Sequence, residues 1–488
     1  MDIFLNTLLS RRILVIAFML ICGLGFSDFY TRGEAREALV VQAMVAEHEY
    51  VLPRGYADLI PSKPPVFHWL GALTSHLMGR VNEFTIRLPS ALASLGTLVF
   101  FLVCLHKYLT TRTSLLFTLF LMFSFEWLRA GVSARVDMVH AAFMSCGLLS
   151  SFLVFETKAP RYWILMIAFF TLATLSKGPV GIAIPSLVLI TWIYLTQKGS
   201  QRFGLAVKVG STVMLSLALS LTWYLTAYFQ APTEFANKVW YENVLRFTSS
   251  THDQPHAHSI FYLIAVLFLG LMPWSPIVCW VAIKCRARSL KDLKDRWSSA
   301  SNLQKFSFIT TSIIILFYCI PSSKRGVYLL AAYPFIAYLS AFLIDSQMKL
   351  SNALVNNLFK ASVIFTLLAQ LFIIPNFIAP RSSEKTVAQT LVSLANTEPI
   401  YSFGFDFFGA SFYAKKKFHK LEEYLLNPSA YSSAPFNVVY FSEQSAQLQD
   451  AIEKLNLNLQ INAEIPLKKD SVKIARVSLK KIEDPKIP

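Results

Sequence analysis

Long apolar runs separated by short polar loops make up the first four fifths of the chain. A helix needs about 20 apolar residues to cross the roughly 30 Å hydrocarbon core of a bilayer. About eleven runs reach or approach that length, although the two at 113–129 and 162–176 are short. The pattern predicts an all-α polytopic membrane domain over residues 1–380, with spans near 11–28, 84–106, 113–129, 138–156, 162–176, 178–196, 204–229, 259–283, 304–321, 326–345 and 355–379.

The chain changes character after about residue 381. Short alternating pieces such as "PIYSFGF" and "FNVVYFS" are typical of strands, and "SAQLQDAIEKLNLNL" is typical of a helix. Residues 381–488 are therefore predicted to form a small α/β domain. It carries no recognisable catalytic motif, so we expect it to support the membrane domain or to guide the substrate.

The segment between the first two predicted spans is unusually long for this chain. In "GEAREALVVQAMVAEHEY", the apolar residues Ala38, Val41, Met44 and Val45 fall on one helical face. "PPVFHWLGALTSHLMG" predicts a second helix that begins with proline. We expect both helices to lie in the membrane interface rather than to span it.

Composition supports the membrane assignment. Of the 488 residues, 54% are hydrophobic and 15% are charged, whereas soluble proteins carry about 25% charged residues. The net charge of +16 is spread over short loops and is not interleaved with aromatic residues in a soluble domain, so nucleic acid is not an expected partner. The six cysteines lie within or beside apolar runs without CxxC spacing, which favours buried thiols over disulfides or zinc.

The basic residues also predict an orientation. Arg11 with Arg12, and the cluster "KCRARSLKDLKDR" at 284–296, belong to the alternate loops that are rich in Lys and Arg. Such loops remain in the cytoplasm. The loop at 29–83 and the C-terminal domain then face outward, which in a bacterium is the periplasmic side of the inner membrane. The first apolar run has no clean cleavage site and is expected to remain as an anchor.

Ionisable residues at membrane level are costly and need a partner or a function. In this chain, those that the hydrophobic pattern does not explain share the predicted outer side. They are Glu34 with Arg36, Lys63, Asp137 with Arg135, Lys177, and Lys324 with Arg325.

Each of these positions has a simpler explanation when taken alone. Glu34 and Arg36 could be solvated on an interfacial helix, Lys63 could reach lipid phosphate, and Asp137 could favour a helix N-terminus. Lys177 lies in a tight turn, where a structural or lipid contact is the simpler interpretation. Because all of these residues share the predicted outer side, we favour a shared functional site.

The loop "ENVLRFTSSTHDQPHAHS" offers two further candidates. Arg246 is expected to contact phosphate or to anchor the loop. His252, His256 and His258 are crowded in a loop without a fixed tetrahedral set, so we do not favour zinc, and a divalent metal stays an open alternative.

The order of these motifs resembles the protein O-mannosyltransferase superfamily, and especially its lipid A aminoarabinose transferase group. These are GT-C type membrane glycosyltransferases that use polyprenyl-phosphate sugars. The resemblance covers roughly residues 25–345. It rests on "GEAREALVVQAMVAEHEYVLP", "SKPPVFHWLGALTSHLMG", "NEFTIRLPSAL", "ARVDMVHAAF", "LSKGPVGIAIP", "ENVLRF", "HDQPHAHSIFYLIAVLFLGLMPW" and "PSSKRGVYLLAAYP" in that order.

The resemblance implies roles for particular residues. Lys63 matches the family lysine that contacts the polyprenyl phosphate, and Arg36 matches an arginine of the first outer loop. Gly33 stands where the family has its leading aspartate, so Glu34 is the candidate acid, with Asp28 a weaker substitute.

Further matches lie outside that loop. Asp137 matches the second family acid, and Arg246 and Lys324 match basic positions near the lipid phosphate. Ser62 replaces a glutamate that binds zinc in some relatives, which argues further against a metal.

These matches predict transfer of a sugar from polyprenyl phosphate to a lipid, glycan or protein acceptor, with inversion at the anomeric carbon. The cations would stabilise the leaving phosphate, and Glu34 or Asp137 would act as base or orienting acid. Two alternatives stay open: a transporter or lipid flippase, and a non-catalytic assembly subunit.

Overall fold

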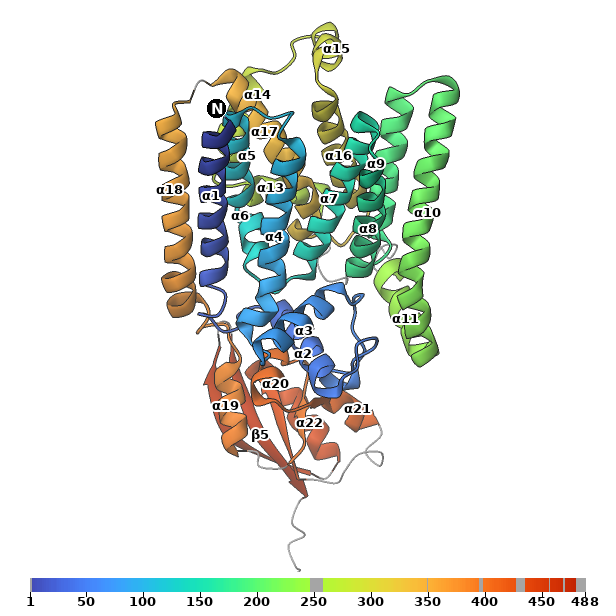
Figure 1. The fold of residues 1–488 in the computed structure, drawn as a ribbon. Coiled ribbons are helices and arrows are strands. Elements are labelled where there is room, and N and C mark those ends of the chain that lie inside the picture. Colours follow the sequence, from blue (N-terminus) through green and yellow to red (C-terminus); the bar gives the residue numbers. More distant parts are fainter. Residues whose placement is uncertain are drawn as a thin grey trace, which may run out of the picture. The chain divides into compact units, whose positions relative to one another are not determined.

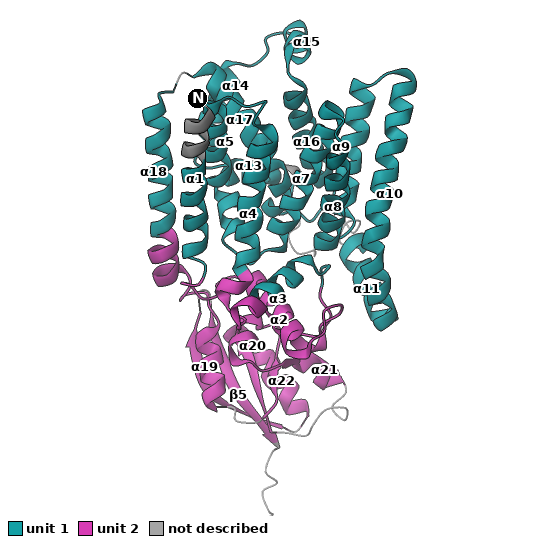
Figure 2. Ribbon diagram, in the orientation of Figure 1, with its two compact units in different colours: residues 1–24, 62–74, 87–368 teal, residues 25–61, 75–86, 369–488 magenta. Residues whose placement is uncertain are grey.

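The computed structural model describes residues 2–245, 258–348, 350–394, 398–426, 435–455, 457–467 and 470–479. The chain divides into two compact units (Figure 2). Unit 1 comprises residues 1–24, 62–74 and 87–368, and unit 2 comprises 25–61, 75–86 and 369–488. Most of the first outer loop thus belongs with the C-terminal residues. This division differs from the single boundary predicted between residues 380 and 381.

Unit 1 is an all-α bundle whose long helices run side by side in Figure 1. Every predicted apolar run coincides with a helix or with a bent pair of helices. These are α1 (Asp2–Cys22), α4 (Glu83–Leu105), α5 (Thr111–Met122) with α6 (Phe125–Gly131), α7 (Val136–Thr157), α8 (Pro160–Lys177), α9 (Val180–Thr196), α10 (Gly199–Gln230), α13 (Ile260–Gly270) with α14 (Ser275–Lys284), α16 (Asn302–Cys319), α17 (Tyr333–Gln347) and α18 (Asn352–Leu368).

The chain is a multi-pass membrane protein. Within the described ranges, five helices are long and apolar enough to span a bilayer, and the two bent pairs raise that number to seven. The remaining predicted runs are helical but fall short of the same criterion, so the total of eleven spans stays a prediction.

Two predicted spans are broken rather than continuous. α5 and α6 meet at 67°, and α13 and α14 meet at 113°. At the first break the Ser124 hydroxyl donates to the Phe120 carbonyl (2.5 Å), and the second break contains Pro273, which lacks an N–H. The N–H of Phe125 donates to the carbonyl of Met272 (3.0 Å). This bond satisfies one backbone group at each break, as a low-dielectric interior requires.

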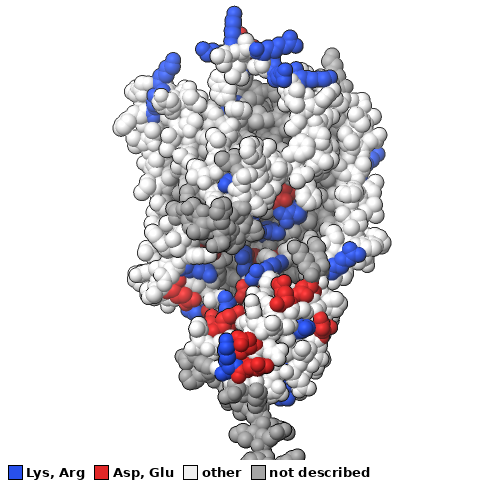
Figure 3. Space-filling view, turned by 180° about the vertical axis from the view of Figure 1, so that it is seen from behind, with Lys and Arg blue, Asp and Glu red and all other residues white. Residues whose placement is uncertain are grey.

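Basic side chains gather at one end of unit 1, on and around α15 (Leu290–Ser299) (Figure 3). This helix belongs to the loop predicted to be cytoplasmic. It is bordered in Figure 3 by a surface almost without charged side chains. The distribution is typical of a helical bundle whose sides face lipid.

Unit 2 contains the predicted α/β domain, built on a five-stranded mixed sheet in the order β2-β1-β3-β5-β4. β1 pairs in parallel with β2 and β3, whereas β5 pairs antiparallel with β3 and β4. Its core includes Tyr401, Val438 and Leu448. The strands are β1 (Ile400–Ser402), β2 (Phe418–Lys420), β3 (Phe436–Phe441), β4 (Leu457–Pro466) and β5 (Ser471–Leu479).

The helices of unit 2 are α2 (Arg32–Glu47), α19 (Lys385–Leu394), α20 (Phe408–Ala414), α21 (Leu421–Leu426) and α22 (Ser445–Lys454). One predicted boundary was wrong, because the helix that begins at Ser445 ends at Lys454 and Leu457–Leu459 belong to β4. There Leu457, Leu459 and Ile461 recur at the two-residue period of a strand.

Both helices predicted in the first outer loop are present. α2 buries Ala38, Val41 and Met44 and contacts α20. α3 (Val66–Met78) begins directly after Pro64 and Pro65. Their position in a membrane interface stays a prediction.

Candidate functional site

A cavity of about 520 Å³ in unit 1 collects several of the polar residues singled out in the sequence. Its walls come from the segment before α3, the turn between α8 and α9, the helical turn Tyr241–Leu245, the end of α16 and the loop after it. The lining residues are Lys63, Lys177, Pro179, Val180, Ala183, Glu242, Asn243, Val244, Phe317, Tyr318, Pro321, Ser323 and Tyr328.

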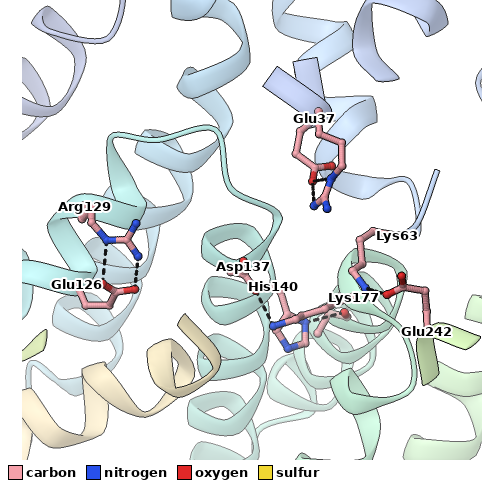
Figure 4. Close-up of polar contacts among 10 residues, drawn as sticks. Glu37, Lys63, Glu126, Arg129, Asp137, His140, Lys177 and Glu242 are labelled. Carbon is pink, nitrogen blue, oxygen red and sulfur yellow. Dashed lines mark hydrogen bonds and ion pairs between the residues drawn. The ribbon is translucent and has the colours of Figure 1, made fainter. Parts of the chain in front are cut away.

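Lys63 lies in this cavity and is paired with Glu242. The distance between Lys63 Nζ and Glu242 Oε2 is 2.6 Å, and the two side chains are 20% and 11% exposed (Figure 4). Pro64 and Pro65 follow Lys63 and restrict the backbone as it enters α3. The lysine predicted to meet an anion is thus already paired with one, the carboxylate of a residue 179 positions later in the chain.

A second ion pair joins Lys177, which lines the cavity, to Asp137 in the first turn of α7. Lys177 Nζ lies 2.6 Å from Asp137 Oδ1 (Figure 4). It also lies 4.2 Å from the centre of the Tyr328 ring. Arg135 and Arg325 also act electrostatically on Asp137. The acid predicted at the entrance of this span is therefore surrounded by cations, and it orients an ammonium group toward the cavity.

The sequence "LSKGPVG" places Lys177 by a tight turn. Lys177 ends α8, where the negative end of the helix dipole favours a cation. Gly178 has a φ of +94°, and a Cβ added there would lie 2.8 Å from the side-chain oxygen of Asn243. Glycine at this position thus lets the turn approach the Tyr241–Leu245 segment, which carries Glu242.

Lys324 is buried beside the same cavity. Its ammonium group donates to the carbonyl of Pro321 (2.6 Å), and both Pro321 and Ser323 line the cavity. The predicted contact of Lys324 with a lipid phosphate stays a prediction.

His140 lies one helical turn after Asp137. Its Nδ1 is 3.0 Å from the carbonyl of Ala173, and its Nε2 has no hydrogen-bond partner within the described ranges (Figure 4). This buried imidazole supports the α7–α8 contact below the ion pair.

Another ion pair of unit 1, half-buried, was not predicted. Arg129 donates to both carboxylate oxygens of Glu126, at 2.9 and 2.5 Å, within the broken span (Figure 4). Gly270 permits the close packing there, because a Cβ at this position would lie 2.1 Å from the Tyr333 hydroxyl and 3.0 Å from the Cβ of Glu126.

The first-loop candidates belong to unit 2. Glu34 is fully buried, and its carboxylate accepts a hydrogen bond from Thr31 (3.2 Å), the residue that caps α2. Arg36 pairs with Glu37, a buried acid that the sequence analysis did not single out. The catalytic role of Glu34 and the phosphate contact of Arg36 stay predictions.

Part of the predicted polar loop lies outside the described residues. This applies to Arg246, His252 and His256. His258 is described, and its ring stacks on Tyr262 with centroids 3.9 Å apart. Within the described ranges no group of three His, Cys, Asp or Glu side chains could hold a metal.

Comparisons with known proteins agree with this architecture. Residues 62–228 match the family described as dolichyl-phosphate-mannose-protein mannosyltransferase. Undecaprenyl phosphate-alpha-4-amino-4-deoxy-L-arabinose arabinosyl transferase from Shewanella sediminis is 22% identical over 63% of this chain and 54% of its own length. The corresponding transferase 2 from Proteus mirabilis is 23% identical over 61% of this chain and 52% of its own.

A solved structure extends the likeness to the whole chain. ArnT from Cupriavidus metallidurans, crystallised with undecaprenyl phosphate, superposes with a TM-score of 0.76 and 17% identity over 99% of this chain and 100% of that one. The chain thus resembles the protein O-mannosyltransferase and aminoarabinose transferase superfamily, by the family match over residues 62–228 and by the fold over nearly its whole length. The oligosaccharyltransferase AglB from Archaeoglobus fulgidus has a more distant likeness of fold, with a TM-score of 0.54 and 11% identity over 92% of this chain and 70% of that one.

These comparisons confirm the resemblance, and the likeness to ArnT confirms the predicted fold class. The alignments span only about half the length of the Shewanella and Proteus transferases. Two residues that the sequence analysis did not assign to the site line the cavity together. Lys177 was interpreted as structural, and Glu242 was not singled out, yet both line the cavity with Lys63. The signal available in the sequence was an acid in "YENV", close to Arg246.

Proposed function

We propose that the protein is a membrane glycosyltransferase that moves a sugar from a polyprenyl-phosphate donor to lipid A, another lipid or glycan, or a protein. The proposal is supported by the superfamily, by relatives named arabinosyl transferases and by the shared fold of an ArnT bound to undecaprenyl phosphate. The acceptor and the sugar are left open within these classes.

The observation that carries the proposal is the cavity with two lysines. When the bond between sugar and phosphate breaks, negative charge develops on the leaving phosphate. Lys63 and Lys177 bring two ammonium groups to one partly closed cavity, where charge-assisted hydrogen bonds are stronger than in water. Arg246 and Lys324 remain predicted additions to this set.

Each lysine is paired with a carboxylate, Lys63 with Glu242 and Lys177 with Asp137. Binding of the donor phosphate would replace Glu242 at Lys63, since one ammonium cannot hold both anions at full strength. Asp137 would keep Lys177 in place, or would accept a proton from the acceptor once Lys177 turns to the phosphate. Glu34 remains the predicted acid of the first loop.

Turnover by purified protein tests the proposal. Full-length protein in nanodiscs would receive undecaprenyl-phosphate-linked 4-amino-4-deoxyarabinose, or hexose donors of the same lipid, together with lipid A or membrane extracts as acceptors. Mass spectrometry should detect the glycosylated acceptor and free undecaprenyl phosphate, and neither product should form with Lys63→Ala. Absence of transfer with every donor would contradict the proposal.

We also propose that the active side is periplasmic, in a bacterial inner membrane. The support is the Lys- and Arg-rich set of alternate loops. A reporter enzyme fused after residue 390 should be active only outside the cytoplasm. Cytoplasmic activity of that fusion would reverse the orientation.

One observation favours a second candidate, a lipid flippase or transporter. Broken spans such as α5–α6 and α13–α14 are common where transporters hold their substrates. Translocation of a fluorescent polyprenyl phosphate across proteoliposomes, without formation of any glycosylated product, would establish that function instead.

A further inference from the structure

A second cavity, of about 300 Å³, lies entirely within unit 2. It is formed by the last turns of α2, the loop that follows it and the segment after α20. Its size is at the lower end of the range of small-molecule sites, which is about 300–1,000 Å³. Leu39, Ala43 and Ala46 from α2 give it an apolar wall, and other lining residues are basic.

The basic side carries an excess of positive charge. Arg54 and the consecutive residues Lys415, Lys416 and Lys417 line the cavity, and Glu47 is the acid among its lining residues. Lys417 pairs with Asp58. Counting both acids, the four cations leave a balance of about two positive charges, a combination that favours an anion with several oxygens.

The loop that forms one edge of the cavity is fixed by tertiary contacts. The hydroxyl of Tyr56 accepts a hydrogen bond from the N–H of Phe407 (3.1 Å), and its ring packs against Phe408 with centroids 4.9 Å apart. Arg54 donates to the carbonyl of Asp58 (2.8 Å). The lysine side is fixed by a different set of bonds.

The lysine run adopts a defined turn at the end of α20. The N–H of Lys415 donates to the carbonyl of Phe412, and the hydroxyl of Ser411 donates to the carbonyl of Lys416 (2.7 Å). Both edges also contain residues in the left-handed region, with φ of 51° at Ala57, 55° at Asp58 and 52° at Lys415. Non-glycine residues adopt this region at an energetic cost, and such positions concentrate at functional sites.

We infer that this cavity binds the phosphate-bearing headgroup of the acceptor. The lysines and Arg54 would hold the phosphate, and the apolar wall from α2 would face the less polar part of the same molecule. The inference rests on the proposed function for naming the acceptor as the source. The phosphate chemistry itself follows from the charge and shape of the cavity.

Binding of a soluble phosphosugar tests the inference. Full-length protein in nanodiscs of zwitterionic phosphatidylcholine is titrated with glucosamine 1-phosphate by calorimetry, with inorganic phosphate as a second probe. The double variant Lys415→Gln/Lys416→Gln should weaken phosphosugar binding at least tenfold. Lys454→Gln is the matched control, because Lys454 is exposed on α22 and pairs with Asp450, and it should bind as the wild type does.

The outcomes separate the possible sources of the phosphate. Tighter binding of the phosphosugar than of inorganic phosphate supports the headgroup, whereas equal binding of both would overturn it in favour of a simple anion site. Loss of phosphosugar binding when phosphatidylglycerol is added to the nanodiscs would assign the cavity to bulk lipid and would also overturn it. If the double variant bound the phosphosugar as tightly as the wild type, the cavity would not be the binding site and the inference would be overturned.

Binding of undecaprenyl phosphate is measured on the same samples. It should be unchanged in the double variant, because Lys63 lies in unit 1. If undecaprenyl phosphate fails to bind the wild type while the phosphosugar binds through Lys415 and Lys416, the proposed function fails and the anion site in unit 2 stands.

Discussion

Replacing Glu242 by glutamine should make the protein bind undecaprenyl phosphate more tightly. In the unliganded cavity the Glu242 carboxylate occupies the ammonium of Lys63 at 2.6 Å. An incoming phosphate has to displace it. Glutamine keeps the size of the side chain and can still accept a hydrogen bond, but it removes the competing charge.

The size of the effect follows from the geometry. At 2.6 Å and an effective dielectric constant of about 20, two unit charges attract by about 6 kcal/mol. Most of that is offset by desolvation, and a hydrogen bond to a charged group contributes a net stabilisation of about 1.5–3 kcal/mol. Each 1.4 kcal/mol is a factor of about ten. Glu242→Gln should therefore lower the Kd for undecaprenyl phosphate by about 10- to 150-fold.

The same change should slow turnover. The product is a phosphate monoester, which carries more negative charge than the diester donor, so the return of Glu242 to Lys63 assists its release. We expect stronger product inhibition and a lower kcat in the variant. Calorimetry and initial rates in nanodiscs measure both quantities.

Glu156→Gln is the matched control. It is the same substitution in the same unit, in the last turn of α7, where the carboxylate accepts a hydrogen bond from Asn302. An unchanged Kd is expected there. If Glu242→Gln also bound undecaprenyl phosphate within twofold of the wild type, Glu242 would not compete with the donor and the reasoning would be refuted.

Three further predictions concern other charged groups. Lys63→Ala should abolish donor binding while Lys63→Arg keeps part of it, because arginine retains the charge with a different geometry; equal binding by the alanine variant would reduce Lys63 to a lipid anchor. Glu34→Gln and Asp137→Asn should each lower kcat by about 10²–10⁴-fold. Asp28 pairs with Lys385, and Asp28→Asn should lower kcat less. A larger loss of kcat in Asp28→Asn than in Glu34→Gln would identify Asp28 as the acid of the first loop. Burial raises the pKa of the Glu384 carboxyl to about 7, so the folded protein holds a proton that the unfolded chain releases near pH 4.5. The free energy of unfolding should therefore fall by about 3 kcal/mol as pH rises from 5 to above 7. If the thermal midpoint of Glu384→Gln changed with pH as the wild type's does, this prediction would be contradicted.

Much of the fold could be predicted from the sequence because hydrophobic length and period are local properties. Every apolar run became a helix, and the strand-like pieces "PIYSFGF" and "FNVVYFS" became β1 and β3. The breaks at Ser124 and Pro273 were missed, since runs of apolar residues continue across both positions. What stabilises each break is a hydrogen bond from Phe125 to Met272, residues far apart in the sequence.

The candidate site could be predicted only in part for the same reason. Lys63 and Asp137 stood out because a charge at membrane level is unusual wherever it occurs. Their partners could not be inferred, because Glu242 and Lys177 reach them through the packing of separate helices. The tight turn at Lys177 favoured a structural or lipid contact, whereas the structure pairs Lys177 with Asp137 and places it in the cavity.

The most direct test of the central claim is an experimental structure of the full-length protein with undecaprenyl phosphate in nanodiscs. We expect a phosphate oxygen about 2.7–2.9 Å from the ammonium of Lys63, with Glu242 turned away from that lysine. A phosphate bound elsewhere, with the pair of Lys63 and Glu242 intact at the 2.6 Å seen here, would contradict it.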